Sequence, residues 1–337
     1  MVEVKPGKQL PQLLNYGVLE SNAHLQRANK VLQSSSLKIF EGEVVELLQS
    51  LMAQMKPHTN QALASLPMFS VFTTVLDFPK MTQTDLEKAM AYQARQYIPL
   101  PLSEVALDWL KVGEYQDERG FVHEQVLLIS VPQDLIKKYQ DLFKRAGLSL
   151  RALEIESLSI TRGLIGTDQA PSIIVDIGSR STNIAFVDKG QLKFSAQSDF
   201  ASASLTQALA SSLNINPLRA EELKKERGIV GAGPNYELST VLLPFLDAIM
   251  SEVKKAQFNY QTQFPRAAKF ERIVISGGGA NLLGLEKYMQ EQLGLPTVKA
   301  SPFFKFEYPS AIEPFVNELN PVFSVALGLT LREFSQP

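Results

Sequence analysis

The sequence predicts an α/β fold made of two strand-rich halves, with a small mixed unit inserted into the first half. Three observations carry this prediction. Short apolar, β-branched segments recur on both sides of about residue 170, amphipathic helical segments connect them, and glycine, proline and polar residues mark the turns. The chain has 337 residues, 45% of them hydrophobic, so it is long enough to fill more than one core.

The composition narrows the classes of function. The 33 basic and 35 acidic residues give a formal net charge of -2, without the basic excess of a nucleic-acid-binding protein. There is no cysteine, which excludes disulfides and thiolate sites, and the three histidines are scattered singly, which disfavours a histidine metal site. Since no signal peptide and no long apolar run is present, we expect a cytoplasmic protein that meets a membrane only through partners.

The first half is expected to begin with strands and to contain one helix before the inserted unit. Residues 41–55 repeat apolar side chains at helical spacing, and Pro57 ends that helix because proline has no N–H to donate. The expected strands are residues 2–4, 13–19, 62–66 and 71–76.

Residues 79–151 are predicted to form a compact αββαβ unit. Thr82 or Thr84 can cap its first helix, because a hydroxyl accepts a hydrogen bond from a free backbone N–H at a helix start. The expected elements are a helix ending at Tyr97, strands Val105–Val112 and Glu124–Val131, a helix over Gln133–Ala146 and a strand over Leu150–Ile155.

In the second half, the pattern of strands and helices starts again. A meander over Ser172–Val187 and Gln191–Ala196 is followed by several helices and by a strand over Arg272–Ser276. The expected helices are Leu205–Leu213, Pro217–Arg227, Leu238–Phe264, Leu282–Leu293 and a last helix from Pro321 to Arg332.

The segment DIGSRSTN between two β-branched runs is a candidate phosphate-binding hairpin. Its glycine permits a tight turn, and successive backbone N–H groups with small hydroxyls can surround phosphate oxygens. Asp176 is placed to hold magnesium through a water molecule or to orient an attacking water. Taken alone, the segment fits an ordinary polar hairpin equally well. The candidate residues are Asp176, Gly178, Ser179, Arg180, Ser181, Thr182 and Asn183.

Two further segments extend this candidate site. Gly277, Gly278, Gly279 and Ala280 lie between a strand and a helix, where missing side chains let a ligand approach the backbone and the helix start favours anions. Glu221 and Lys224 lie three residues apart on one helical face, where they could bracket an adenosine. A plain tight connection and a solvated charged helix are the alternatives for these two segments.

The order and spacing of the three segments resemble the second half of the actin and sugar-kinase superfamily, which binds ATP between two halves. Within it, almost the whole chain resembles the family of type IV pilus assembly protein PilM, which is related to the cell-division protein FtsA. Three stretches carry the resemblance: LDFPKMTQTDLEKAMAYQARQYIPLPLSEVALDW (76–109), VISGGGANLLGLEKYMQEQLGLPT (274–297) and NPVFSVALGLTLRE (320–333).

The resemblance implies an actin-like, ribonuclease H-like duplicated fold that binds ATP and Mg²⁺. It implies a first half (1A-like) at 1–75, an inserted 1C-like (SHS2-like) subdomain at 76–151, a linking helix at 152–170, and a second half (2A and 2B) at 171–337 whose last helix returns to the first half. It further implies a cytoplasmic scaffold at the inner membrane, which links a PilN-type peptide tail to pilus motor ATPases. Self-association stays open.

The resemblance also places a peptide groove at the inserted unit. The candidate residues that structure or line it are Phe78, Pro79, Tyr92, Gln96, Tyr97, Ile98 and Pro99. An extended tail would bind there as a helix in a groove or as an added strand. The alternative is that these aromatic residues only pack the core of the unit.

Two departures from the family pattern lower the expected activity. The family begins with another strand and phosphate hairpin, which this sequence does not contain, and Phe200-Ala201 stands where a Gly-Gly pair is usual. We therefore expect weak nucleotide binding, little or no ATPase activity, and an exposed edge in the first sheet. The alternatives are an FtsA-like division protein and a sugar kinase or exopolyphosphatase relative, which would need a catalytic carboxylate beside a substrate pocket.

Overall fold

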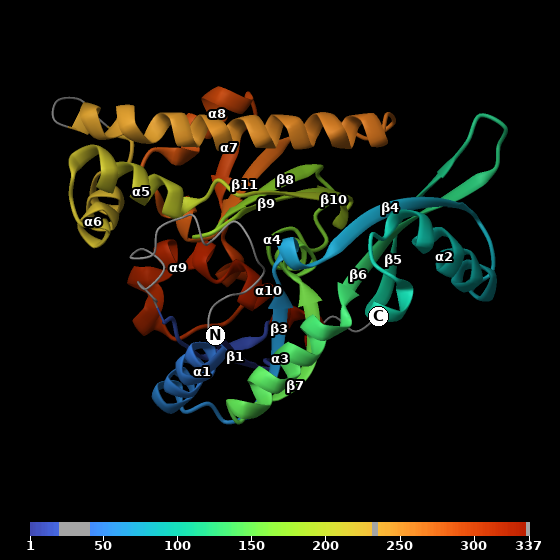
Figure 1. The fold of residues 1–337 in the computed structure, drawn as a ribbon, viewed down its shortest axis with the longest axis horizontal. Helices are drawn as coiled ribbons and strands as arrows, with labels where there is room; N and C mark the ends of the chain where they lie inside the picture. Colours follow the sequence, from blue (N-terminus) through green and yellow to red (C-terminus); the bar gives the residue numbers. More distant parts are fainter. Residues whose placement is uncertain (20–40, 231–234, 335–337) are drawn as a thin grey trace.

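The computed structural model describes residues 1–19, 41–230 and 235–334, and its second half is built on one five-stranded sheet (Figure 1). The strands lie in the order β10 (Gln191–Ser198), β9 (Thr182–Asp188), β8 (Ser172–Ile177), β11 (Arg272–Ser276) and β12 (Thr297–Lys299). The central strand, β8, is antiparallel to β9 and parallel to β11. Four of its six residues are aliphatic, and Ile173, Ile174 and Val175 have no exposed surface, as expected for a strand covered on both faces.

Helices cover this sheet on both sides (Figure 1). The long helix α7 (Asn235–Gln263) lies along one face and α4 (Glu156–Leu164) lies under the other. Phe186 of β9 stacks on Tyr260 of α7 with ring centroids 5.2 Å apart, which anchors α7 to the sheet. Helices α5 (Ser202–Leu213), α6 (Pro217–Arg227) and α8 (Leu285–Leu293) also belong to this half. Among the described residues, no helix combines the length and the apolar character that a bilayer span requires.

The strands of the first half form two separate pairs. β1 (Val2–Lys5) is antiparallel to β2 (Gln12–Tyr16), and β3 (Gln61–Leu66) is parallel to β7 (Ser149–Ile155). The helices α1 (Glu41–Met55) and α3 (Gln133–Arg145) contact each other, and α3 also packs on β7. The last helix, α10 (Ser324–Phe334), contacts both β1 and β3 and so spans the two pairs.

The small sheet has the order β4 (Phe72–Pro79), β6 (Val122–Pro132), β5 (Val105–Gln116), and α2 (Gln83–Tyr97) packs against it. The expected αββαβ grouping is wrong in one respect, because β7 pairs with β3 and not with this sheet. Parallel neighbours need a long crossover, and residues 67–148 form that crossover between β3 and β7. Strand β4 takes the third place in the small sheet, paired with β6.

The C-terminal segment corrects a second expectation, a single helix from Pro321 to Arg332. Two helices are present, α9 (Val316–Val322) and α10, with a break at Phe323. The Pro321 carbonyl accepts hydrogen bonds from Gly277 N at 2.9 Å and from the Ser276 hydroxyl at 3.3 Å. Since this carbonyl is bound to the β11 end, it is drawn away from the helical ladder and α9 stops there. The remaining short helical turns are η3 (Met68–Ser70), η4 (Leu102–Glu104), η5 (Gly278–Asn281), η6 (Pro302–Lys305) and η7 (Ser310–Phe315).

The two halves are joined by a close crossing of α4 and α10. A Cβ atom added at Gly328 would lie 1.9 Å from the Ser159 carbonyl oxygen, and one at Gly163 would lie 2.9 Å from the Ser324 carbonyl oxygen. Such distances are far inside van der Waals contact, so only glycine allows this crossing. Arg162 strengthens it, because its guanidinium donates to the Gly328 carbonyl at 2.9 Å and pairs with Glu154 at 2.5 Å.

We predict that Gly328→Ala destabilises the protein by about 1–3 kcal/mol or more, because the added methyl group forces the backbones of α4 and α10 apart. The free energy of unfolding in urea measures this. The matched control is Gly42→Ala in α1, where an added Cβ meets no atom within 4 Å and alanine favours the helix by up to about 1 kcal/mol. Equal stability of the two variants would contradict the crossing.

Candidate functional site

The predicted phosphate hairpin joins β8 to β9, and its turn rests on the start of α5. The Gly178 N–H donates to the Ser181 carbonyl at 3.0 Å and closes the turn. The N–H groups of Ser202 and Ala203, at the start of α5, donate to the carbonyls of Gly178 and Ser179 at 3.0 and 2.9 Å. The first residues of α5, directly after Phe200-Ala201, therefore hold the hairpin through backbone hydrogen bonds.

The triple glycine lies against the end of β8. Gly277 has a φ of 78°, and a Cβ atom there would lie 2.4 Å from the Ile177 carbonyl oxygen and 2.9 Å from an Asp176 carboxylate oxygen. A Cβ atom at Gly279 would lie 2.4 Å from the Ile177 side chain, whereas one at Gly278 meets no atom within 4 Å. Gly277 and Gly279 thus allow the close approach of two backbones, and Gly278 is open to a ligand. Ala280 is fully buried and cannot contact one.

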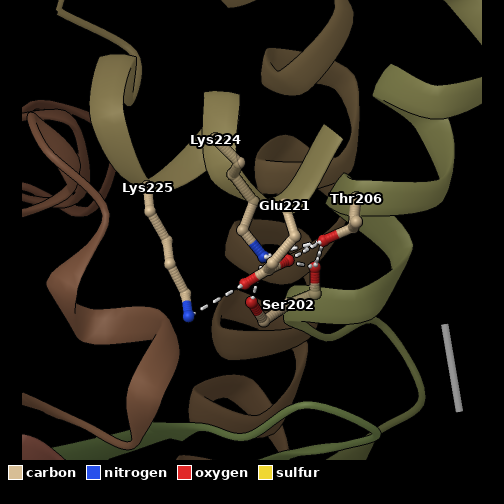
Figure 2. Close-up of polar contacts among 5 residues, drawn as sticks. All are labelled: Ser202, Thr206, Glu221, Lys224 and Lys225. Atoms are coloured by element: carbon tan, nitrogen blue, oxygen red, sulfur yellow. Dashed lines mark hydrogen bonds and ion pairs between the residues drawn. The ribbon is translucent and has the colours of Figure 1, made fainter. Parts of the chain in front are cut away.

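The charged helix α6 joins the same site through a buried cluster, which Figure 2 shows. The Lys224 ammonium lies 2.6 Å from a Glu221 carboxylate oxygen, 2.7 Å from the Ser202 hydroxyl and 2.8 Å from the Thr206 hydroxyl. Ser202 is the residue whose N–H holds the hairpin, so α6 is coupled to the hairpin through α5. Of the three predicted segments, distant in sequence, the hairpin and the triple glycine therefore meet at the end of β8, and α6 is linked to them through α5.

The ion pair limits what Lys224 can bind. Its side chain is only 6% exposed, and burial lowers the pKa of Lys224, although Glu221 opposes this shift. Burial alone would raise the pKa of Glu221, but the Lys224 ammonium and the hydrogen bonds from Lys224 and Thr206 outweigh it and lower the pKa. Because the ammonium is satisfied by protein groups, its clear role is to fasten α6 to α5, and the partly exposed Glu221 is the group that can meet a ligand.

Two other hairpin residues also have internal partners. The Asn183 side chain exchanges hydrogen bonds with the Ser157 hydroxyl of α4, and the Thr182 hydroxyl donates to the Phe200 carbonyl at 2.7 Å. Both side chains are buried, so the expectation that the Thr182 hydroxyl surrounds a phosphate is wrong, and the side chain of Asn183, also a candidate, is turned to α4. They position the hairpin instead. Ser179, Arg180 and Ser181 stay exposed or half-buried at its tip.

Asp176 faces a second carboxylate, Glu156, which the sequence analysis did not single out. Burial raises the pKa of Asp176 to about 6, against a hydrogen bond from Ser276. Burial and the charge of Asp176 raise the pKa of Glu156 to about 7, against a hydrogen bond from the Met68 backbone. The signal in the sequence was a carboxylate placed directly after the strand Leu150–Ile155, since strand ends are where such folds gather polar groups.

The carboxylates of Asp176 and Glu156 determine how the expected magnesium ion can be bound. Among the described residues, no group of three carboxylate or histidine side chains could hold a metal ion. Two carboxylates near a phosphate hairpin fit an ion that is held chiefly by the phosphates of a nucleotide and by water, which is how Mg²⁺ commonly binds. Asp176 and Glu156 would then contact its water molecules.

The predicted partner residues divide into a buried and an exposed set. Phe78 and Ile98 are 4% and 7% exposed and pack in the core of the small sheet with Met90, so they cannot contact a partner. Tyr92 and Tyr97 are 66% and 48% exposed. Pro79, Gln96 and Pro99 are exposed as well. The structure thus leaves five exposed candidate residues, on α2 or within four residues of its ends, which we call the α2 surface: Pro79, Tyr92, Gln96, Tyr97 and Pro99.

Comparison with known proteins agrees on the family and on the fold. The family model described as type IV pilus assembly protein PilM matches residues 18–334. A solved PilM–PilN type IV pilus biogenesis complex contains a chain with a TM-score of 0.82 and 21% identity, over 99% of this chain and 95% of that one. MreB5 of Spiroplasma citri, solved bound to ADP, gives a TM-score of 0.53 and 16% identity over 88% and 76% of the two chains.

Cell division protein FtsA of Enterococcus hirae is 24% identical over 208 residues, which are 53% of this chain and 46% of that protein. The match therefore spans about half the length of this curated relative. These relatives share the actin-like fold, so the expected fold class is confirmed.

We predict that Glu156 makes the protein less stable as pH rises. Its pKa is about 7 in the folded state and about 4.3 in an unfolded chain, so its favourable contribution is complete below pH 4 and is lost as pH rises through 7. Between pH 5 and 8, Glu156 should cost the unchanged protein roughly 2–3 kcal/mol of unfolding free energy. The Glu156→Gln variant should not show this loss, and urea unfolding of both proteins measures the difference.

The matched control is Glu118→Gln, at a carboxylate whose side chain is 90% exposed, and it should leave the pH dependence as it is. If Glu156→Gln and the unchanged protein lose the same stability between pH 5 and 8, Glu156 is not buried beside Asp176.

Proposed function

The chain belongs to the family of type IV pilus assembly protein PilM, and we propose that it is an actin-like nucleotide-binding scaffold of a type IV pilus or type II secretion-like assembly machine. One observation supports the nucleotide site above the others: the phosphate hairpin and the triple glycine meet at the end of β8, and helix α6 is tied to the hairpin through the start of α5. The division-protein alternative has weaker support, because its match covers 53% of this chain.

In the proposed site, ATP lies between the halves of the chain with its phosphates at the hairpin. Backbone N–H groups at the hairpin tip and the open face of Gly278 receive the phosphate oxygens, since a Cβ atom added at Gly278 would meet no atom within 4 Å. Asp176 holds Mg²⁺ through water, and the exposed side of Glu221 lies toward the adenosine. The first half, with β3, β7 and α4, forms one wall of the site, and the second half, with the five-stranded sheet, forms the other.

The proposed partners follow from the family. A PilN-type cytoplasmic tail binds the α2 surface beside the small sheet β4–β6–β5, where two tyrosines offer apolar rings with hydroxyl tips. The scaffold thereby connects the inner-membrane complex with the cytoplasmic motor ATPases. The chain itself stays in the cytoplasm and meets the membrane through these partners. We also propose that the chain self-associates.

We predict that Gly278→Leu abolishes binding of ATP with Mg²⁺ and leaves stability within about 0.5 kcal/mol, because the new side chain enters space that the protein leaves open. Isothermal titration gives the affinity and urea unfolding gives the stability. The control Gly42→Leu, also at a glycine without neighbouring atoms, should bind as the unchanged protein does. Hydrolysis, followed in the same samples, should stay well below ~1 per second.

Unchanged ATP affinity in the folded Gly278→Leu variant would show that the nucleotide does not bind at the triple glycine. Turnover near the rate of an ordinary enzyme would contradict the scaffold role.

We predict that Tyr97→Ala and Tyr92→Ala each weaken capture of a PilN-type peptide by about tenfold, which is roughly 1.4 kcal/mol, without changing ATP affinity. Fluorescence anisotropy of a labelled peptide measures the binding. Phe258→Ala is the control, since Phe258 is 68% exposed on α7 and far along the chain from α2. A tail that binds both tyrosine variants as tightly as the control would show that the α2 surface is not its site.

A further inference from the structure

A cavity lies where the small sheet meets the second half, and none of the residues named for the nucleotide site or the α2 surface lines it. Its volume is about 920 Å³, within the range of roughly 300–1,000 Å³ that is usual for small-molecule sites. The β5–β6 hairpin forms one wall, and the turn between β9 and β10 forms another together with the end of α7. We call it the junction cavity, and its lining includes Gly113, Tyr115, Phe121, Lys193 and Tyr260.

Strand β10 brings a buried ammonium to the junction cavity. Lys193 is only 6% exposed, and its Nζ atom donates a hydrogen bond to the Val112 carbonyl of β5. An ammonium has three donors, and among the described residues this carbonyl is the one acceptor that the structure gives it. Burial lowers the pKa of Lys193, while the charge of Asp188 opposes this shift and that of Lys189 adds to it. Because a buried donor without an acceptor costs free energy, the remaining N–H groups favour an acceptor supplied by a ligand.

Gly113 of β5 keeps the space beside this ammonium open. A Cβ atom added there would lie 2.7 Å from the Lys193 Nζ atom and 2.8 Å from the Gln125 Oε1 atom. These two groups therefore face the same point, over a backbone that carries no side chain. The pairing of β5 with β6 also shifts register between Lys111 and Gly113, and such irregularities often lie next to functional sites.

A second donor is Tyr260 of α7, whose ring is fixed by its neighbours. It stacks on Phe186 with centroids 5.2 Å apart, and Phe264 and Phe270 pack against it at 5.0 and 5.3 Å. Burial and the charge of Asp188 raise the pKa of Tyr260, so its hydroxyl keeps the proton and remains a donor. Within the part of the chain that the structure describes, no group accepts this proton, which leaves the hydroxyl available to a ligand.

The hairpin side of the junction cavity offers flat surfaces. The Arg266 guanidinium lies 6.0 Å from the centre of the Tyr115 ring and donates a hydrogen bond to the Gln116 carbonyl at 3.1 Å. The ring of Phe121 is 65% exposed. Aromatic rings and a fixed guanidinium plane are suited to stacking against a planar ligand.

The acidic residues of the hairpin do not compete for the ammonium. Glu114 is paired with Lys111 at 2.8 Å, and the Asp117 carboxylate accepts two backbone N–H groups at 2.9 Å. Lys193 therefore faces the junction cavity as a charge that only Asp188 moderates. This distribution fits one anionic group near Lys193 and an uncharged ring along the hairpin.

We propose that the junction cavity binds a small organic anion made of a planar ring and one carboxylate or phosphate group. The anionic group accepts hydrogen bonds from the Lys193 ammonium and the Tyr260 hydroxyl, and the ring stacks on Tyr115 and Phe121. Since this ligand contacts both the hairpin and the second half, it strengthens a junction that otherwise depends on contacts such as Lys193 to the Val112 carbonyl. The site is independent of the proposed nucleotide site.

The test titrates the full chain with two fluorescent probes, naphthoate and naphthyl phosphate, which carry the two anionic groups on the same ring. At least one should bind with one probe per protein and a dissociation constant on the order of 1 mM or tighter, as expected for ligands of this size. The tighter probe identifies the anionic group. Uncharged naphthyl alcohol should bind about tenfold more weakly or less, because it lacks the charge that Lys193 attracts. An excess of ATP with Mg²⁺ should leave the bound probe in place.

Two variants connect the binding with the cavity. Lys193→Met removes the charge and keeps the apolar length of the side chain, so it should weaken binding of the anionic probes about tenfold or more and leave the alcohol unchanged. Lys287→Met is the matched control, at a side chain 84% exposed on α8. If Lys193→Met does not fold, Tyr260→Phe decides, since it keeps the packed ring and should weaken the anionic probes roughly fivefold.

Three results would overturn the proposal. The first is the absence of saturable binding by either anionic probe. The second is binding that neither Lys193→Met nor Tyr260→Phe weakens relative to the control. The third is displacement of the probe by ATP with Mg²⁺, which would assign the binding to the nucleotide site.

Discussion

The structure of the site depends on the close approach of two backbones at the end of β8. The turn after β11 passes so near Ile177 and Asp176 that a Cβ atom at Gly277 or Gly279 would overlap them. This approach fixes the triple glycine beside the phosphate hairpin, and it brings the Gly277 N–H to the Pro321 carbonyl, which ends α9 and turns the chain into α10. Helix α10 then crosses α4 and reaches β1 and β3. One contact between backbones thus links the candidate nucleotide site to the packing of the two halves.

The sequence predicted much of this arrangement, because local signals and packing agree along most of the chain. Helices α1, α3 and α6 begin and end within one residue of their predicted bounds, since prolines, caps and glycine mark their ends. The partner of Leu150–Ile155 was missed, because strand pairing is set by long-range packing that periodicity does not contain. The break after α9 was missed for a related reason: the Pro321 carbonyl is taken by Gly277, a residue 44 positions earlier.

At the site, too, local sequence patterns identified the segments, whereas the direction of their side chains depends on residues elsewhere in the chain. Glycine and hydroxyl residues between β-branched runs identified the hairpin, but the inward direction of Thr182 and Asn183 depends on Phe200 and Ser157, which lie elsewhere in the chain. Spacing placed Glu221 and Lys224 on one face of a helix, and only the fold shows that this face is buried against α5. Glu156 stands alone in the sequence and becomes notable because Asp176 lies across from it.

The central claim is that the hairpin, the triple glycine and helix α6 form one nucleotide site on a rigid frame. Amide hydrogen exchange with and without ADP and Mg²⁺ tests it most directly, because it reports on all three segments in a single unaltered protein. The account predicts that residues 178–181 and 277–279 gain protection together at the same nucleotide concentration, with a smaller gain in α6 around Glu221. Protection confined to one segment, or found only in other parts of the chain, would contradict it.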